Sequence, residues 1–200
     1  MKKSERIALQ VYAEAADFFG PLEPPYGYKI LYGPPHHKAP ILFIGYNPGG
    51  DAPEAHERDR WPSVCEYATA NYKFACAIRR LFDRQFLKQC VALNGIFVRT
   101  PGSDTYKKEF RVERRRSIEK FCMERVNRLV DAIDPQKIVI IGFNTLWLFG
   151  GGNPRLRNDN RDLLREGLVA GRPAIATIHL TGARPPLSME DFDIIGRGLS

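Results

Sequence analysis

A short apolar run that ends in glycine constrains the fold of this chain more than any other feature. Residues 41–44 read Ile-Leu-Phe-Ile without the alternation of a half-exposed strand, so they predict a strand buried on both faces of a sheet. Gly-Tyr-Asn-Pro-Gly-Gly follows at 45–50 and places Asn47 at the carboxyl end of that strand, where open α/β sheets bind ligands. A plain strand-ending turn explains the same residues, so the motif alone leaves both interpretations open.

Helices and short apolar strands alternate along the rest of the chain. Apolar residues at helical spacing predict an amphipathic helix over 5–19, and six prolines in 20–40 predict a connecting loop. Apolar runs predict strands at 91–93 (continuing through 96–98), 137–141 and 173–178. Three more helices are predicted: one from a Ser63 cap to about 82, one over 113–133, and a last one that begins at a Ser188–Asp191 capping box. We expect an α/β fold, a three-layer α/β/α arrangement with a central, mainly parallel four-stranded sheet.

Length and composition favour one domain over residues 1–200, with 1–40 as an N-terminal helix and proline-rich lead-in. A chain of 200 residues that is 44% hydrophobic can bury a substantial core. No apolar run of about 18 residues predicts a membrane span, and the first residues lack the apolar core of a signal peptide. We therefore expect a cytoplasmic protein, nucleoid-associated if bacterial.

The cysteines and histidines do not predict a metal or cluster site. The four cysteines are widely spaced without a Cys-x-x-Cys pair, which indicates buried thiols in a reducing compartment. His36, His37 and His56 have no neighbouring ligands at metal-binding spacing and are interpreted as exposed loop residues. We expect no cofactor.

Polar residues gather where the predicted strands end. Tyr46 and Asn47 follow the first strand, Asn94 lies in the second, Asn144 follows the third, and His179 follows the fourth. The carboxyl ends of parallel strands meet at one edge of a sheet, so a composite pocket is expected there. Structural roles stay open for Asn94 and Asn144, since either amide could satisfy backbone groups and Asn144 could cap a short helix at 145–149.

Two of these segments resemble the signature motifs of the uracil-DNA glycosylase superfamily. Gly45-Tyr46-Asn47-Pro48-Gly49 is similar to the Gly-x-Asn-Pro-Gly form of its mismatch-specific and single-strand-selective branches. The loop that begins at His179 resembles the family's His-Pro-Ser loop in part, because Leu180 and Thr181 replace proline and serine. The resemblance covers about residues 38–200.

The resemblance implies base flipping followed by hydrolysis of a glycosidic bond. Asn47 would orient the attacking water through its carbonyl oxygen, and His179 would donate a hydrogen bond to the departing base. The backbone N–H of Tyr46 would lie near that base. Trp61 is the closest match to the family's stacking aromatic, although it could equally pack into the core. By the same resemblance Asn94 and Asn144 become base-binding candidates.

A net charge of +7 suggests a polyanionic partner. Candidate DNA contacts are Arg155 and Arg157 in a glycine- and asparagine-rich loop, Arg184 in the histidine loop, and Leu187, which resembles the family's base-displacing wedge. A third basic run, over 107–116, also fits a solvated face.

The sequence therefore predicts a monofunctional DNA-repair N-glycosylase that acts as a monomer and without metal on uracil or a related damaged base in double- or single-stranded DNA. No lysine occupies an obvious nucleophile position. Two alternatives stay open, a catalytically silent nucleic-acid-binding module of the same fold and an enzyme acting on a free nucleoside or nucleotide.

Overall fold

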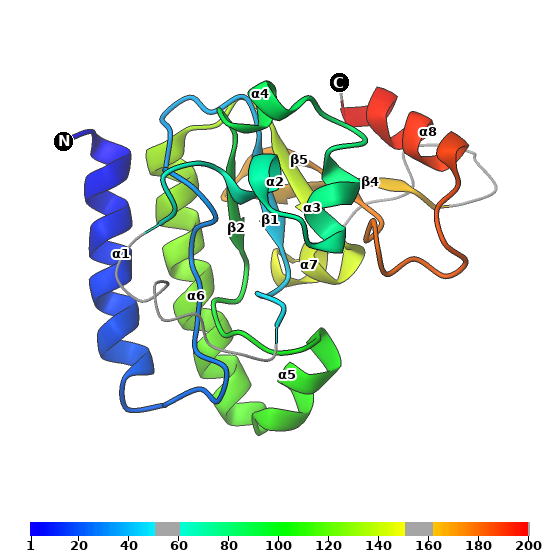
Figure 1. Cartoon of the computed structure of the whole chain (residues 1–200). Helices are drawn as coiled ribbons and strands as arrows, with labels where there is room; N and C mark the ends of the chain where they lie inside the picture. Colours follow the sequence, from blue (N-terminus) through cyan, green and yellow to red (C-terminus); the bar gives the residue numbers. More distant parts are fainter. Residues whose placement is uncertain (51–60, 151–161, 200) are drawn as a thin grey trace.

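The chain folds into a five-stranded sheet with helices on both faces (Figure 1). The computed structural model describes residues 1–50, 61–150 and 162–199. The strand order is β2-β1-β3-β5-β4. Four strands are parallel, namely β1 (Leu42–Gly45), β2 (Val91–Asn94), β3 (Ile138–Ile141) and β5 (Arg172–Thr177). The predicted α/β fold with a mainly parallel sheet is confirmed.

The expected strand count was one too low. β4 (Leu164–Val169) pairs antiparallel with β5 at the sheet edge. Its burial alternates from Arg165 to Val169, because one face is covered and the other is open to solvent. Arg165 and Glu166 interrupt its apolar residues, so no continuous apolar run marks this strand in the sequence.

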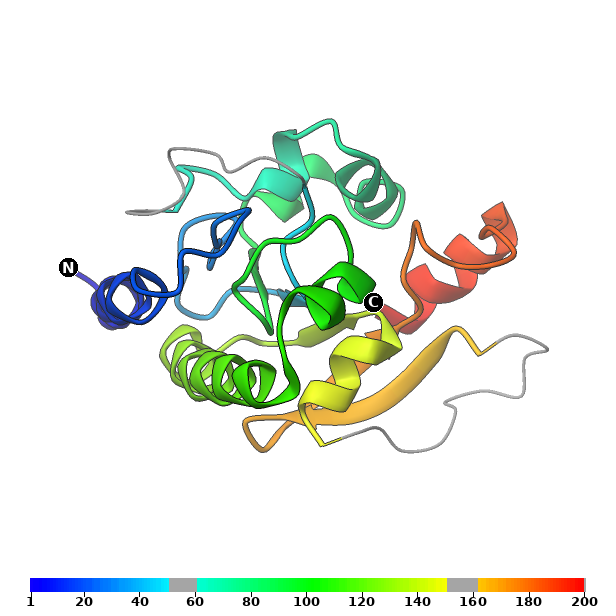
Figure 2. The same ribbon diagram turned by 90° about the horizontal axis from the view of Figure 1, so that it is seen from below.

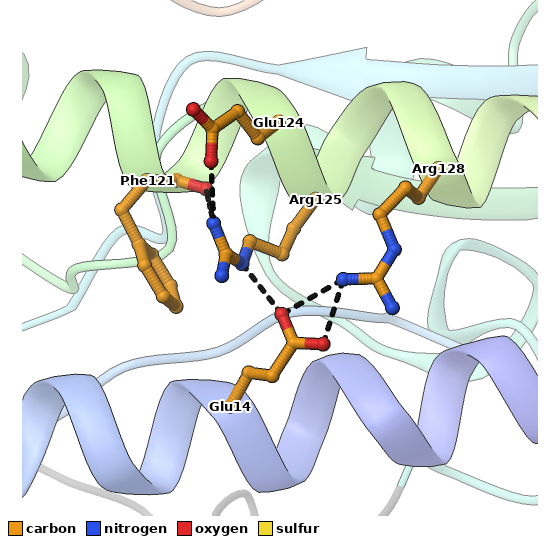
Figure 3. Close-up of polar contacts among 5 residues, drawn as sticks. All are labelled: Glu14, Phe121, Glu124, Arg125 and Arg128. Carbon is orange, nitrogen blue, oxygen red and sulfur yellow. Dashed lines mark hydrogen bonds and ion pairs between the residues drawn. The ribbon is translucent and has the colours of Figure 1, made fainter.

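Two long helices cover one face of the sheet. α1 (Lys3–Phe19) and α6 (Val112–Ile133) pack beside each other, and their apolar residues join those of β1, β2 and β3 in one core cluster. Glu14 of α1 accepts hydrogen bonds from Arg125 and Arg128 of α6 at 2.7–2.8 Å (Figure 3). The predicted helices over 5–19 and 113–133 are confirmed.

Short helices cover the other face. α2 (Glu66–Thr69), α3 (Lys73–Ile78), α4 (Arg84–Leu87) and α8 (Met189–Leu199) pack there around alternate strand residues such as Phe43 and Val139. The single helix predicted from Ser63 to about 82 is wrong. Arg79 Nη1 donates to the carbonyl oxygens of Tyr67 and Ala70 at 3.0 and 2.6 Å. These hydrogen bonds satisfy backbone acceptors at the carboxyl end of α2, so the helix can end there and the chain can turn.

The proline-rich lead-in is more than a connection. Residues 28–32 run antiparallel along β2, with bridges Tyr28–Val98 and Leu31–Leu93. Tyr32 N donates to the carbonyl oxygen of Ala92 at 2.8 Å. This segment covers the β2 edge of the sheet, which would otherwise expose unpaired backbone groups.

Two further helices lie where the parallel strands end. α5 (Ser103–Glu109) follows β2, and α7 (Phe143–Leu148) follows β3 (Figures 1 and 2). Sequence patterns did not predict α5. They also misplaced the start of α7, whose N-cap is Gly142 and whose first turn includes Asn144, so Asn144 does not take the capping role that the sequence left open for it. The Ser188–Asp191 capping box at α8 is confirmed by reciprocal bonds of 2.7 and 3.1 Å.

Candidate active site at the carboxyl edge of the sheet

The amide of Asn47 is held in one orientation by the loop after β2. Nδ2 donates to Thr100 Oγ1 at 2.7 Å and to Pro48 O at 3.1 Å, and it lies 3.5 Å from Val98 O. The Thr100 hydroxyl donates its own proton to Gly102 O at 2.8 Å, so it accepts from Asn47. A flipped amide would set Oδ1 against these carbonyl oxygens. The Oδ1 atom is therefore the part of the amide that remains to accept a hydrogen bond from a ligand or water.

A buried arginine holds the glycine end of the same turn. Arg99 Nη1 donates to Gly49 O at 2.9 Å, and Thr100 N donates to Pro48 O at 3.1 Å. Gly50 has a φ of +117°, and a Cβ there would lie 2.9 Å from Arg99 Nη1. Sequence reasoning missed Arg99 and Thr100, whose only signal is a pair of polar residues directly after the apolar run at 96–98.

His179 follows β5 by two residues and lies beside the end of β3. Its ring centroid is 5.5 Å from that of Phe74 in α3, and a Cβ at Gly142 would lie 3.7 Å from the imidazole Cδ2. The residue is accessible to solvent, yet enough protein surrounds the ring that desolvation lowers the pKa of His179 below its usual value. The lowered pKa favours the neutral imidazole, which has one N–H to donate.

A tight turn fixes the position of this ring. Gly182 N donates to His179 O at 3.3 Å, which brings residues 181 and 182 back beside the imidazole. Thr181 Oγ1 lies 3.5 Å from Nδ1. A Cβ on Gly182 would lie 3.1 Å from Nδ1, so a side chain at 182 would crowd the imidazole, whereas glycine does not.

A row of aromatic rings extends from His179 across the short helices. The Phe74 ring is 5.4 Å from the Tyr67 ring, which is 5.8 Å from the Tyr32 ring. Phe74 is half-buried and therefore keeps part of its ring surface accessible. Sequence reasoning missed Phe74, although the aromatic residues at 67, 72 and 74 signal an unusual density of rings.

Asn94 lies at the other end of this row. It is 4% exposed, and its Nδ2 donates to the Tyr32 hydroxyl oxygen at 2.8 Å. A Cβ on Gly45 would come within 2.5 Å of Asn94 Oδ1, so only glycine at 45 lets this amide lie against the end of β1. In the structural role left open for Asn94, the amide thus binds the side chain of Tyr32 and not only backbone groups.

A buried ion pair lies under Tyr32. Lys29 Nζ is 2.6 Å from Glu66 Oε1 and 4.5 Å from the centroid of the Tyr32 ring. Lys29 belongs to the lead-in and Glu66 begins α2, so the pair fixes both segments beside Asn94. Neither residue was singled out in the sequence, because the partners are 37 positions apart.

The side chains of two predicted base-binding residues, Tyr46 and Trp61, pack against other aromatic rings; the role predicted for Tyr46 concerned its backbone N–H. Tyr46 packs edge-on against Tyr106 of α5, with ring centroids 6.3 Å apart, and desolvation raises the pKa of its phenol. Trp61 packs edge-on against Tyr12 of α1 at 5.9 Å and joins the core cluster on that face. Trp61 thus packs against the core, as the second interpretation allowed, and lies on the opposite face of the sheet from Phe74.

The remaining predicted residues differ in placement. Asn144 is exposed on the first turn of α7, and Arg184 is exposed in the loop after His179. Leu187 is half-buried and packs against the core cluster of the short helices, so it does not protrude as a free apolar wedge. Arg155 and Arg157 lie outside the described residues, as does His56.

The basic run over 107–116 begins in α5, the helix that lies beside the turn of Asn47. Thr100 bonds to Gly102, the N-cap residue of α5, and Tyr106 of α5 contacts Tyr46. Five side chains of the run are exposed, namely those of Lys107, Lys108, Arg111, Arg114 and Arg116. Figure 2 shows α5 on the near side of the molecule, at the same end as α7. Exposure of these side chains fits a solvated face and a polyanion-binding surface alike.

Asn47 and His179 share the carboxyl edge of the sheet. They follow β1 and β5, which flank β3, and strands about 4.8 Å apart put these two strand ends roughly 10 Å from each other. His179 lies over the end of β3, where a Cβ added to Gly142 would meet its side chain at 3.7 Å. The topology therefore brings the two predicted catalytic residues to one edge, with Asn94 and Phe74 beside them.

Metal-binding groups and membrane-spanning helices can be sought only in the residues that the structure describes. Within residues 1–50, 61–150 and 162–199, no three His, Cys, Asp or Glu side chains group closely enough to hold a metal ion. No helix in those ranges combines the length and apolarity that crossing a membrane requires. Cys65, Cys90 and Cys122 are buried as expected, but Cys76 is exposed because it lies on the outer side of α3.

No protein-family model matches the chain, and no curated protein matches it either.

Proposed function

We propose that this protein is a monofunctional DNA N-glycosylase that hydrolyses the glycosidic bond of uracil or a related damaged base flipped out of DNA. The observation that carries the proposal is the fixed amide of Asn47, whose Nδ2 is committed to the Thr100 loop. Its Oδ1 thus faces away from the carbonyl oxygens of that loop and is available to orient a water molecule. An amide positions water without removing its proton as a strong base would.

His179 supplies the complementary group. A water molecule forms a bond to C1′ as the bond from C1′ to the base nitrogen breaks, and the bonding electrons leave with the base. Negative charge then develops on the base carbonyl oxygen, and the neutral imidazole donates a hydrogen bond to it. The water proton passes to solvent or to the departing base.

The surroundings supply recognition. The half-buried ring of Phe74, next to His179, offers a flat surface on which an extruded base can stack. Asn94 offers an amide whose orientation Tyr32 fixes. Phe74 replaces Trp61 as the stacking residue of the proposal, since Trp61 packs against α1. The exposed lysines and arginines of 107–116 support a DNA partner and predict that affinity falls steeply with salt.

The direct test is release of uracil from a labelled oligonucleotide by the wild-type protein and by Asn47→Ala. We expect the variant to be slower by roughly 10²-fold or more, because it loses the group that positions water. Gln10→Ala removes an exposed amide from α1 and serves as the matched control. Equal rates for the wild type and Asn47→Ala would contradict the assigned role.

The same assay separates the two alternatives. Tight binding of uracil-containing DNA without base release would indicate a silent binding module. Turnover of a free nucleoside at a rate independent of salt would indicate a small-molecule enzyme, because phosphate contacts are salt-dependent.

A further inference from the structure

The outer face of α7 carries an exposed tryptophan. Trp147 is 64% exposed, whereas Phe143, Leu146 and Leu148 of the same helix pack against the core. Asn144 precedes Trp147 by three positions and is also exposed, so the two side chains lie on one face of the helix. The indole of Trp147 therefore offers a large flat apolar surface to a ligand that approaches this face of the helix.

The position of α7 indicates what kind of partner this is. The helix starts directly after Gly142, beside which the side chain of His179 lies, so α7 begins at the edge of the sheet that carries the candidate site. The exposed lysines and arginines at 107–116 lie at the same edge. Positive charge together with an exposed ring is the combination that binds the backbone and bases of an unpaired nucleic-acid strand.

We propose that Trp147 stacks on an unpaired base next to the flipped nucleotide and holds the DNA strand across the carboxyl edge of the sheet. This inference rests on the proposed function, because it takes DNA as the ligand. It assigns the strand-holding contact to α7 rather than to Leu187, whose side chain packs against the core.

The chain offers a direct fluorescence test because it has only two tryptophans. Trp61→Phe leaves Trp147 as the sole indole, and Trp147→Phe leaves Trp61. The probe is a single-stranded oligonucleotide with one tetrahydrofuran abasic analogue, which cannot be turned over. We expect it to quench the emission of the Trp61→Phe protein in a saturable way and to leave that of Trp147→Phe nearly unchanged.

Affinity measurements complete the test. Trp147→Ala should weaken binding of the same oligonucleotide by roughly 5- to 150-fold, the range for loss of one stacked base. The loss should be the same at about 50 and 200 mM salt, since stacking releases no counterions. Leu168→Ala removes another exposed apolar side chain, on β4, and should bind like the wild type.

Unchanged affinity in Trp147→Ala, or no quenching of the Trp61→Phe protein, would overturn the inference. An equal loss of affinity in Leu168→Ala would overturn it as well, because the effect would then be general. The proposed function is tested separately by uracil release. Asn47-dependent release with no role for Trp147 would refute only the inference, and strand binding through Trp147 without any release would refute only the glycosylase proposal.

Discussion

Replacing Glu14 by Gln tests how strongly α1 is fixed to the rest of the fold. The Glu14 carboxylate accepts from Arg125 Nε at 2.8 Å and from Arg128 Nη1 at 2.7 and 2.8 Å (Figure 3). Arg125 is itself held by Glu124 and by the face of the Phe121 ring, 4.0 Å away. Glu124 and Phe121 thus order the Arg125 guanidinium independently of Glu14, which lowers the entropic cost of forming the ion pair with Glu14.

The expected magnitude follows from partial exposure. The side chains of Glu14, Arg125 and Arg128 are 33%, 19% and 39% exposed, so solvent screens each pair. Such pairs contribute about 0.2–1 kcal/mol each, and we expect Glu14→Gln to lower the free energy of unfolding by about 1 kcal/mol. In a chain of this length that corresponds to a decrease in Tm of about 2–4 °C.

The dependence on pH has a definite sign. Partial burial raises the pKa of Glu14, but the hydrogen bonds and charges of Arg128 and Arg125 outweigh it and bring the pKa below its usual value. A carboxylate with a lowered pKa stabilises the fold above the pKa of the unfolded chain. That contribution is lost as the pH falls through the folded pKa. The wild type and Glu14→Gln should therefore converge in acid.

Thermal unfolding at pH 7 in low salt and in about 1 M NaCl measures the effect, with Asp17→Asn as a control that removes an exposed carboxylate from the same helix. High salt should reduce the difference, because the Debye length falls to about 3 Å. An unchanged Tm in Glu14→Gln, or a decrease that salt does not affect, would refute the electrostatic reasoning.

Three further predictions concern the candidate site and the thiols. Thr100→Val removes the hydroxyl that orients Asn47 and should slow uracil release roughly 5- to 10-fold, the effect of one hydrogen bond, as measured in single-turnover assays; full activity would contradict it. Gly182→Ala places a Cβ 3.1 Å from His179 Nδ1 and should shift the imidazole NMR signals and slow release, whereas Gly196→Ala, with only ordinary contacts, should do neither. A disulfide reagent should react rapidly with Cys76 alone in the folded protein, because burial raises the pKa of the three other thiols to about 11 or 12; rapid reaction of a second thiol would refute that assignment.

The regular parts of the fold were predictable because local patterns specify them. Apolar runs at 41–44 and 137–141 gave buried parallel strands, and helical spacing gave α1 and α6 nearly to their ends. The capping box at Ser188 was equally local. In contrast, β4 carries charged residues and depends on pairing with β5, so its strand character comes from a neighbour rather than from its own residues.

The sequence by itself determined that Asn47 and His179 follow strands of one parallel sheet, because neighbouring residues specify both a buried strand and the turn that follows it. Only the tertiary structure decided what these side chains contact. Thr100 is 53 positions from Asn47, and Phe74 and His179 belong to different elements of the chain. The same holds for Trp61, which packs against Tyr12, and for Trp147, which is left exposed. Contacts between residues far apart in the chain depend on how helices pack on the sheet, and no local pattern encodes that packing.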